Sequence, residues 1–205
     1  GDDAGADLAT LFEGIERIDG IARTRFLTSY PKDMTDRIID AVADLPKVCE
    51  HFNIPVQSGD DTMLTRMRRG YTVAEYEERV ARIRSRMPDV ALATDVIVGA
   101  PGETDEEFAN TVALLERTKF DVIHVAAYSP RPGTFAYRNQ PDEVPREVKS
   151  ARLQVIEALH AESAGAINAR MLNRTVEVLV EREVEGRCTG RARGGPDRRV
   201  RPARA

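Results

Sequence analysis

Four short polar segments hold most of the residues that could do chemistry, and each directly follows an apolar run. The segments are residues 28–31, 55–59, 99–104 and 128–134. Gln57 and Ser58 offer neutral donors and acceptors, while Arg131, held between two prolines, presents a cation suited to a carboxylate or phosphate. Gly99 allows the backbone to approach a ligand closely, although turn formation explains a single glycine as well.

The elements that must position these segments alternate between strand and helix. Strands are predicted at residues 22–28, 48–54, 90–98 and 121–127. Helices are predicted after Pro31 with Asp33 as the cap, at about 60–68 and 73–86, from Thr104 onward, and from Pro145 to about Met171. The pairs Thr72–Glu75 and Thr104–Glu107 have the spacing of capping boxes, which supports two of these helix starts.

Alternating apolar strands and helices predict an α/β fold with a parallel sheet, because parallel strands need crossover helices. The pattern fits a slice of a barrel or an open doubly wound sheet. In both architectures ligands bind at the carboxyl ends of the strands. We therefore expect the four polar segments to lie at one edge of the sheet.

The pattern changes after the long helix. The expected apolar stripe of that helix is Val148, Ala151, Val155 and Leu159. Residues 175–180 then alternate as a half-buried antiparallel strand does. We place a domain boundary near residue 170, with a first domain at 1–170 and a second segment at 171–205, which is too short to fold alone.

Composition narrows the class of protein. With 41% hydrophobic and 31% charged residues, the chain of 205 residues is typical of a globular protein. It contains no run of about 18 apolar residues, and its first residues lack the features of a signal peptide. Cys49 and Cys188 are too far apart in sequence for a metal motif, so we expect two free thiols, no metal site and a packing role for Cys49.

Charge is distributed unevenly along the chain. Residues 187–205 contain seven arginines and one acidic residue, a net charge of +6, so the total of −4 leaves −10 for the first 186 residues. A basic end on an acidic body suggests contact with a polyanion such as nucleic acid. A solvated tail without a partner explains the charge equally well.

Five separated stretches resemble, in order and spacing, the radical S-adenosylmethionine methylthiotransferases. The stretches are residues 25–34, 48–60, 67–72, 95–104 and 129–134. The Thr-Ser-x-Pro element at residues 28–31 is similar to that of the MiaB-type enzymes, which act on isopentenyladenosine in tRNA. Tyr30 stands where a histidine is commoner in that group.

The resemblance implies strands three to six of a six-stranded, half-open partial barrel, followed by a truncated, β-rich, TRAM-like RNA-binding segment. It implies that residues beside S-adenosylmethionine are Gln57, Ser58, Arg69, Asp95, Ile97 and Gly99. The residues expected to contact substrate are Ser129, Arg131, Arg191 and Arg193. Residues 95–103 are similar to the family's Gly-x-Ile-x-Gly-x-x-Glu strand, except that Asp95 replaces the first glycine and Glu103 comes one place late.

The activity implied for the intact enzyme is insertion of a methylthio group into isopentenyladenosine next to the anticodon of tRNA. The family's three-cysteine motif is absent here, so its 4Fe-4S clusters would be held by another segment, which would also receive the reductant and the sulfur. We therefore expect a C-terminal fragment that is inactive alone, with no catalytic residue of its own. The resemblance further implies a cytoplasmic, monomeric enzyme that does not bind membranes.

Other functions remain open on the sequence alone. A sister enzyme of the same family modifies a ribosomal protein. A non-catalytic RNA-binding fragment would use the barrel slice only as a scaffold. An unrelated phosphate-binding α/β enzyme is disfavoured because the chain lacks a glycine-rich phosphate loop.

Overall fold

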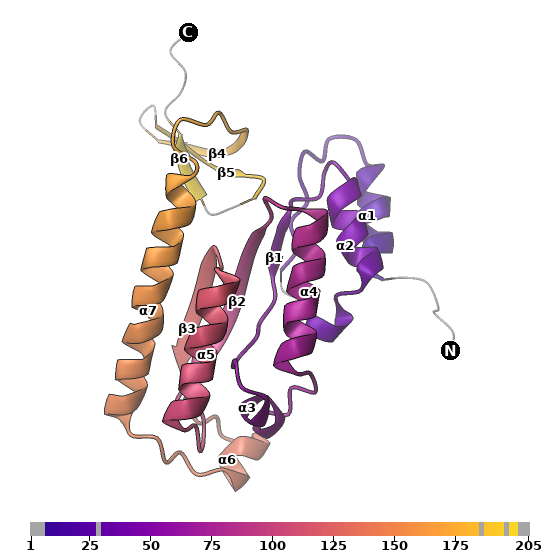
Figure 1. The fold of residues 1–205 in the computed structure, drawn as a ribbon. Coiled ribbons are helices and arrows are strands. Elements are labelled where there is room, and N and C mark those ends of the chain that lie inside the picture. Colours follow the sequence, from indigo (N-terminus) through magenta and orange to yellow (C-terminus); the bar gives the residue numbers. More distant parts are fainter. Residues whose placement is uncertain (1–6, 28–29, 185–186, 195–196, 201–205) are drawn as a thin grey trace, which may run out of the picture.

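A computed structural model describes residues 7–27, 30–184, 187–194 and 197–200. Its helices are α1 (Leu8–Glu16), α2 (Asp36–Asp44), α3 (Asp61–Arg66), α4 (Val73–Arg86), α5 (Asp105–Thr118), α6 (Phe135–Asn139) and α7 (Arg146–Ala169). Its strands are β1 (His51–Asn53), β2 (Ala91–Val98), β3 (Val122–Ala127), β4 (Val178–Val184), β5 (Arg187–Ala192) and β6 (Asp197–Val200). Two separate sheets result, one parallel and one antiparallel (Figure 1).

The parallel sheet has the order β1-β2-β3, with β2 in the centre. Helices α4 and α5 cover one face of this sheet (Figure 1). Leu92, Val96 and Val98 of β2 are buried on that face with the aromatic side chains of Phe52 and Tyr76. The predicted α/β fold with a parallel sheet is confirmed.

The prediction of a first strand at residues 22–28 is wrong. Within its described part, the segment meets the sheet only at one parallel bridge, between Thr24 and Val48. Two backbone hydrogen bonds make this contact, Thr24 N to Lys47 O at 2.7 Å and Cys49 N to Thr24 O at 2.9 Å. The arginines on either side of Thr24 are used instead to bind the C-terminal segment, as described below.

Most predicted helices are present, and both capping boxes are confirmed. Thr72 and Glu75 begin α4, and Thr104 and Glu107 begin α5, each with reciprocal hydrogen bonds. The predicted cap at Asp33 is wrong, because Pro31 starts a short 3₁₀ turn and the Thr35 side chain caps α2 instead. Helices α1 and α6 were not predicted.

The predicted apolar stripe of α7 is correct only in part, because Leu159 packs against the hydrophobic core and other members do not. Val155 is 46% exposed and Ala151 is exposed, whereas Lys149, Arg152 and Ile156 are buried. The helix is rotated so that two cations face the protein interior, where they complete a polar network at the edge of the parallel sheet.

The antiparallel sheet has the order β4-β5-β6, with register pairs such as Val178–Ala192 and Gly190–Arg198. An antiparallel strand was predicted at 175–180 and is found at Val178–Val184. Its apolar side chains are less buried than the alternation indicated, since Leu179 and Val180 are exposed. Figure 1 places this sheet beyond the C-terminal end of α7, beside the amino ends of the parallel strands.

Candidate functional site

The carboxyl ends of the parallel strands bring three of the four polar segments to one edge. Ile97 N donates to Gln57 O at 3.0 Å, which aligns the end of the β1 segment with β2. Tyr128 N donates to Val98 O at 2.8 Å, which places the segment after β3 beside Gly99. Ser129 and Arg131 follow in an exposed loop. Thr28 and Ser29 of the fourth segment lie outside the described residues.

Gln57 is held in an unusual backbone conformation. Its φ is +68°, in the left-handed region, and the residue is buried. Two hydrogen bonds fix it on β2, from Gln57 N to Asp95 O at 2.9 Å and from Ile97 N to its own carbonyl. A non-glycine residue held in this region is a feature that concentrates at ligand sites.

Side chains from α4 and the preceding loop stabilise the chain just before Gln57. Pro55 has no N–H to donate to the neighbouring strand. Tyr71 Oη donates to Val56 O at 3.1 Å, and Tyr76 Oη donates to Ile54 O at 2.8 Å. Burial raises the pKa of Tyr71 to about 12 and raises the pKa of Tyr76 further. Both phenols therefore stay protonated and keep donating.

The side chain of Ser58 packs against α5. Its buried hydroxyl lies 3.2 Å from Thr111 Oγ1 of α5. Gly59 explains this close approach, because a Cβ there would lie 2.6 Å from Thr111 Cα. The two residues pack the strand end against the helix, so the cofactor contact predicted for Ser58 finds no side-chain support in this arrangement.

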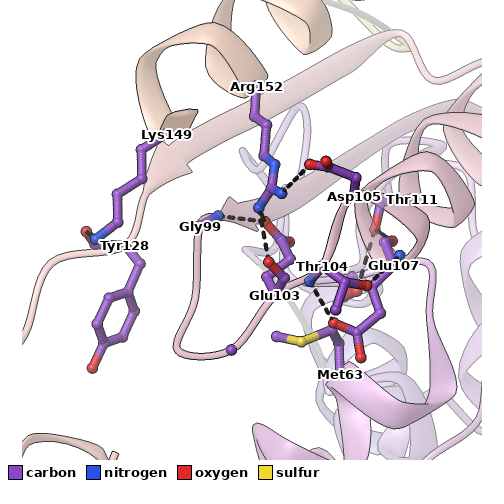
Figure 2. Close-up of polar contacts among 12 residues, drawn as sticks. Met63, Gly99, Glu103, Thr104, Asp105, Glu107, Thr111, Tyr128, Lys149 and Arg152 are labelled. Atoms are coloured by element: carbon purple, nitrogen blue, oxygen red, sulfur yellow. Dashed lines mark hydrogen bonds and ion pairs between the residues drawn. The ribbon is translucent and has the colours of Figure 1, made fainter. Parts of the chain in front are cut away.

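A buried network of ion pairs lies next to Gly99 (Figure 2). This network was not predicted from the sequence. Arg152 Nη1 lies 2.6 Å from Glu103 Oε2, and the same carboxylate oxygen accepts from Gly99 N at 2.6 Å. Arg152 Nη2 also reaches Asp105 Oδ1 at 2.7 Å. The side chains of Glu103 and Arg152 are only 1% and 7% exposed.

These ion pairs therefore attach the loop after β2 to α7. Burial raises the pKa of Glu103, while the Gly99 N–H and the Arg152 guanidinium act in the opposite direction. The signal in the sequence was the run Lys149, Arg152 and Ile156, which shares one helical face. Charged residues on a helix are usually expected to face solvent. The burial of these two cations was therefore not predicted from the sequence.

Lys149 holds both ends of the loop that carries Arg131. Its Nζ lies 2.5 Å from Asp142 Oδ1 and 3.2 Å from Tyr128 O. Its aliphatic chain packs on Gly99, whose φ is +69° and where any Cβ would collide with Lys149 Cγ. The amide and the Cβ side of Gly99 are therefore both occupied by protein, which gives this glycine a structural role.

Arg69 and Asn53 each leave a buried polar atom without a protein partner. Among the described residues, the atoms in question are Arg69 Nε and Asn53 Oδ1. Arg69 follows α3 at the carboxyl edge, where its backbone oxygen accepts from Tyr30 Oη. A guanidinium N–H without a partner fits a carboxylate or a hydroxyl of a ligand.

Asp95 and Ile97 point to the face of the sheet opposite α4 and α5. Both are partly exposed, whereas their neighbours Thr94 and Val96 are buried on the helix side. Asn53 Nδ2 lies 3.3 Å from Asp95 Oδ2. His51 lies on this face too, and burial, with a smaller effect of Arg25, lowers the pKa of its imidazole.

Arg191 and Arg193 lie at the other edge of the sheet. Arg193 Nη2 donates to Val48 O at 2.8 Å, and Arg25 Nη2 donates to Arg193 O at 3.1 Å. Arg23 Nη1 donates to Arg191 O at 2.5 Å, and Arg191 itself pairs with Glu181 at 3.3 Å. These two predicted substrate residues are thus far along the strands from Gln57 and Gly99, where they attach the C-terminal segment. The other arginines predicted to give a basic surface have no described side chains, and Arg201 and Arg204 lie outside the described residues.

The same amino edge contains a groove of about 1030 Å³. It lies between the second half of α7 and residues 192–194, and both acidic and basic side chains line it. Its mixed charge does not favour a nucleic-acid strand over other ligands.

The residues that the structure describes contain no group of three or more metal-ligating side chains. Cys49 is buried and Cys188 is half-buried, and neither is in a disulfide. These side chains do not fit an iron–sulfur cluster, so no step through a cluster is derived from them. No helix in the described part of the chain has the length and apolarity to cross a membrane.

A parallel sheet with polar residues at the carboxyl ends of its strands is found in a broad class of α/β proteins. Comparison with known families shows to which of these proteins the chain is similar. The family model of the radical SAM superfamily matches residues 2–115, and the chain belongs to this superfamily.

Curated relatives agree with this assignment. The chain is 50% identical over 188 residues to the tRNA-2-methylthio-N(6)-dimethylallyladenosine synthase of Dehalococcoides mccartyi strain CBDB1, covering 92% of this chain and 45% of that protein. It is 51% identical over 191 residues to the synthase of the same name from Roseiflexus sp. strain RS-1, covering 92% of this chain and 40% of that protein. The predicted membership in the radical SAM superfamily is confirmed, and these similar proteins carry the name of a tRNA methylthio-modifying synthase, as the resemblance implied. The chain spans less than half the length of these relatives.

Proposed function

We propose that this chain forms part of a radical S-adenosylmethionine methylthiotransferase that acts on isopentenyladenosine in tRNA. The observation that carries the proposal is the identity of about half of all residues, over 92% of the chain, to enzymes named for that product. In this proposal β1, β2 and β3 are part of a six-stranded barrel, and β4 to β6 begin a TRAM-like segment. The other part of the enzyme would supply the cluster-binding cysteines.

The residues at the carboxyl edge would hold S-adenosylmethionine, which supplies radical chemistry when it is bound and reduced. Gln57, fixed with its strained backbone on β2, would present its side chain to the cofactor. Arg69, whose buried Nε–H has no partner in the described part of the chain, suits the carboxylate of the methionine moiety. The network of Arg152 and Glu103 would keep the loop at Gly99 in place beneath it.

The RNA would be bound from the opposite edge. The C-terminal segment is attached there by Arg23, Arg25 and Arg193, and its sequence carries the excess of arginines. We propose the anticodon stem-loop as the contacted region, and a monomeric enzyme of the cytoplasm, where tRNA is modified. A reductant and a sulfur source would act through the cluster-binding part.

A chimera tests this function. The matching 188-residue segment of the Dehalococcoides mccartyi relative is replaced by the segment of this chain that aligns with it. The chimera is produced in cells whose tRNA carries isopentenyladenosine without the methylthio group, and digested tRNA is analysed by mass spectrometry. We expect the methylthio nucleoside to form.

The chain expressed by itself serves as the negative control, and the intact relative serves as the positive control. Failure of a folded, cluster-loaded chimera to modify tRNA would contradict the proposal. Methylthiolation of a ribosomal protein by the chimera, with unmodified tRNA, would instead support the sister activity.

A further inference from the structure

A row of three polar side chains crosses the open face of the parallel sheet. Asp95 of β2 is the register partner of His124 of β3, so their side chains lie side by side on one face. Asn53 of β1 continues the row, because its Nδ2 lies 3.3 Å from Asp95 Oδ2. Helices α4 and α5 cover the other face, and His124 is exposed.

The row presents hydrogen-bonding groups to a ligand, and one of them is unsatisfied within the described residues. Asn53 Oδ1 is buried and has no partner among the described residues. An unpaired buried carbonyl is unfavourable, so this atom is suited to accept from a ligand N–H. Asp95 adds a partly exposed carboxylate, and the imidazole of His124 can donate or accept.

An apolar layer lies next to the row on the side of the carboxyl edge. It consists of Ile97 and its register partner Ala126, both on the same face as Asp95 and His124. Ala126 is exposed and small, so space remains above it. An apolar surface beside a line of acceptors and a donor suits a flat heterocycle, which packs through its face and bonds through its edge.

The position of the row also indicates a nucleobase. Asp95 lies four residues before Gly99, about 13 Å below the carboxyl edge at the usual rise of a strand. The C-terminal segment is bonded to the amino edge through Arg25 and Arg193. The row therefore lies between the C-terminal segment at the amino edge and the proposed cofactor site at the carboxyl edge.

We propose that Asn53, Asp95 and His124 form a subsite that selects an adenine base in the RNA substrate, an inference that rests on the proposed function. The carboxylate of Asp95 accepts from the exocyclic N–H of the base, and His124 donates to a ring nitrogen. A guanine presents a carbonyl oxygen where adenine presents its N–H, so the carboxylate rejects it. Asp95 thereby takes a substrate role in place of the cofactor role expected from its motif.

The test measures binding of the 205-residue chain to two RNA hairpins by fluorescence anisotropy. The hairpins are identical except for isopentenyladenosine or guanosine at one loop position. We expect at least about tenfold preference for the modified adenosine, as for one good base contact. Asp95→Ala and His124→Ala should each reduce the preference to less than about threefold, while Glu157→Gln, an exposed acid on α7, should keep it.

The outcomes separate the two proposals. Equal binding of both hairpins by the unchanged chain, or full preference in Asp95→Ala, overturns the subsite and leaves the RNA function standing. Absence of any RNA binding by the unchanged chain also overturns the subsite, and formation of the methylthio nucleoside by the chimera would then show that the proposed function still stands. Titration of S-adenosylmethionine into the chimera adds a second arm, because a large loss of cofactor affinity in Asp95→Asn would assign Asp95 to the cofactor and end the proposal.

Discussion

Arginines hold both edges of the parallel sheet, but they bind different groups. At the carboxyl edge, Arg152 bonds to the buried carboxylate of Glu103 and so fixes the loop at Gly99. At the amino edge, Arg25 and Arg193 bond to backbone carbonyl oxygens and so attach the C-terminal segment. Loss of Arg152 leaves a buried anion at the first edge, whereas loss of Arg25 or Arg193 leaves only unpaired carbonyls at the second. The carboxylate that Arg23 binds at the amino edge, that of Glu177, is exposed to solvent.

This difference suggests different mechanical roles. A carboxylate paired with one guanidinium needs that partner in one geometry, which suits the edge proposed to hold a cofactor. Backbone carbonyls are present on every residue, so an attachment through them can loosen at smaller cost. We infer that the carboxyl edge is rigid and that the amino edge permits the C-terminal segment to move.

The largest expected effect comes from breaking the carboxyl-edge pair. Arg152→Met leaves the Glu103 carboxylate buried without its cation, and we expect a loss of about 3–5 kcal/mol in the free energy of unfolding. Urea denaturation followed by circular dichroism measures it. Adding Glu103→Gln should restore part of the loss, since no buried charge then remains. An unchanged stability in the single variant would show that solvent reaches the pair.

A second variant tests the close packing behind the same edge. Gly99→Ala forces a side chain into a left-handed backbone conformation and against Lys149, and we expect about 2 kcal/mol of destabilisation. In a Lys149→Ala background the cost of Gly99→Ala should fall, because only the backbone strain remains. Gly14→Ala in α1, where a Cβ meets no atom within 4 Å, is the matched control and should not destabilise.

A substitution at the amino edge should reduce stability less, and its effect should be confined to the C-terminal segment. Arg25→Met removes hydrogen bonds to the C-terminal segment, and we expect about 1 kcal/mol of lost stability. Amide hydrogen exchange should increase in β4 and β5 while β2 stays protected. Arg17→Met, an exposed arginine after α1, should change neither region. Faster exchange throughout β2 would contradict the difference between the two edges.

The smallest expected effect is a pH dependence from His51. Burial keeps the pKa of His51 in the folded chain below its ordinary value of about 6.5, so the unfolded chain binds more protons in this range. Stability should therefore fall as the pH drops below about 6.5, and level off below the folded pKa. NMR titration gives that pKa, and His51→Gln should remove this part of the pH dependence. A folded pKa above 6.5 would refute the sign.

The sequence predicted the central strands and the helices that cover them better than the contacts at the two edges of the sheet. Apolar runs and capping boxes are local signals, and they located β2, β3, α4 and α5 correctly. The segment around Thr24 has the composition of a strand but meets its neighbour at a single bridge, and strand pairing is a tertiary property. No local pattern reveals how many hydrogen bonds such a segment makes.

The candidate site was predicted in part. The positions of Gln57 and Gly99 at one edge followed from parallel-sheet topology. The roles of Ser58 and Gly99 in packing, and of Lys149 and Arg152 as buried cations, depend on how α5 and α7 are rotated against the sheet. That rotation is set by long-range contacts, and the shared helical face of Lys149, Arg152 and Ile156 was the only local sign of it.

The claim that the carboxyl edge holds the cofactor can be tested directly by NMR. The ¹⁵N-labelled chain is titrated with S-adenosylmethionine, and shifts of assigned amide signals are mapped on the structure. We predict that shifts concentrate at Gln57, Ile97 and Arg69, with Thr24, Val48 and Gly194 at the amino edge unchanged. Shifts confined to the amino edge, or no shift at saturating cofactor, would contradict the account.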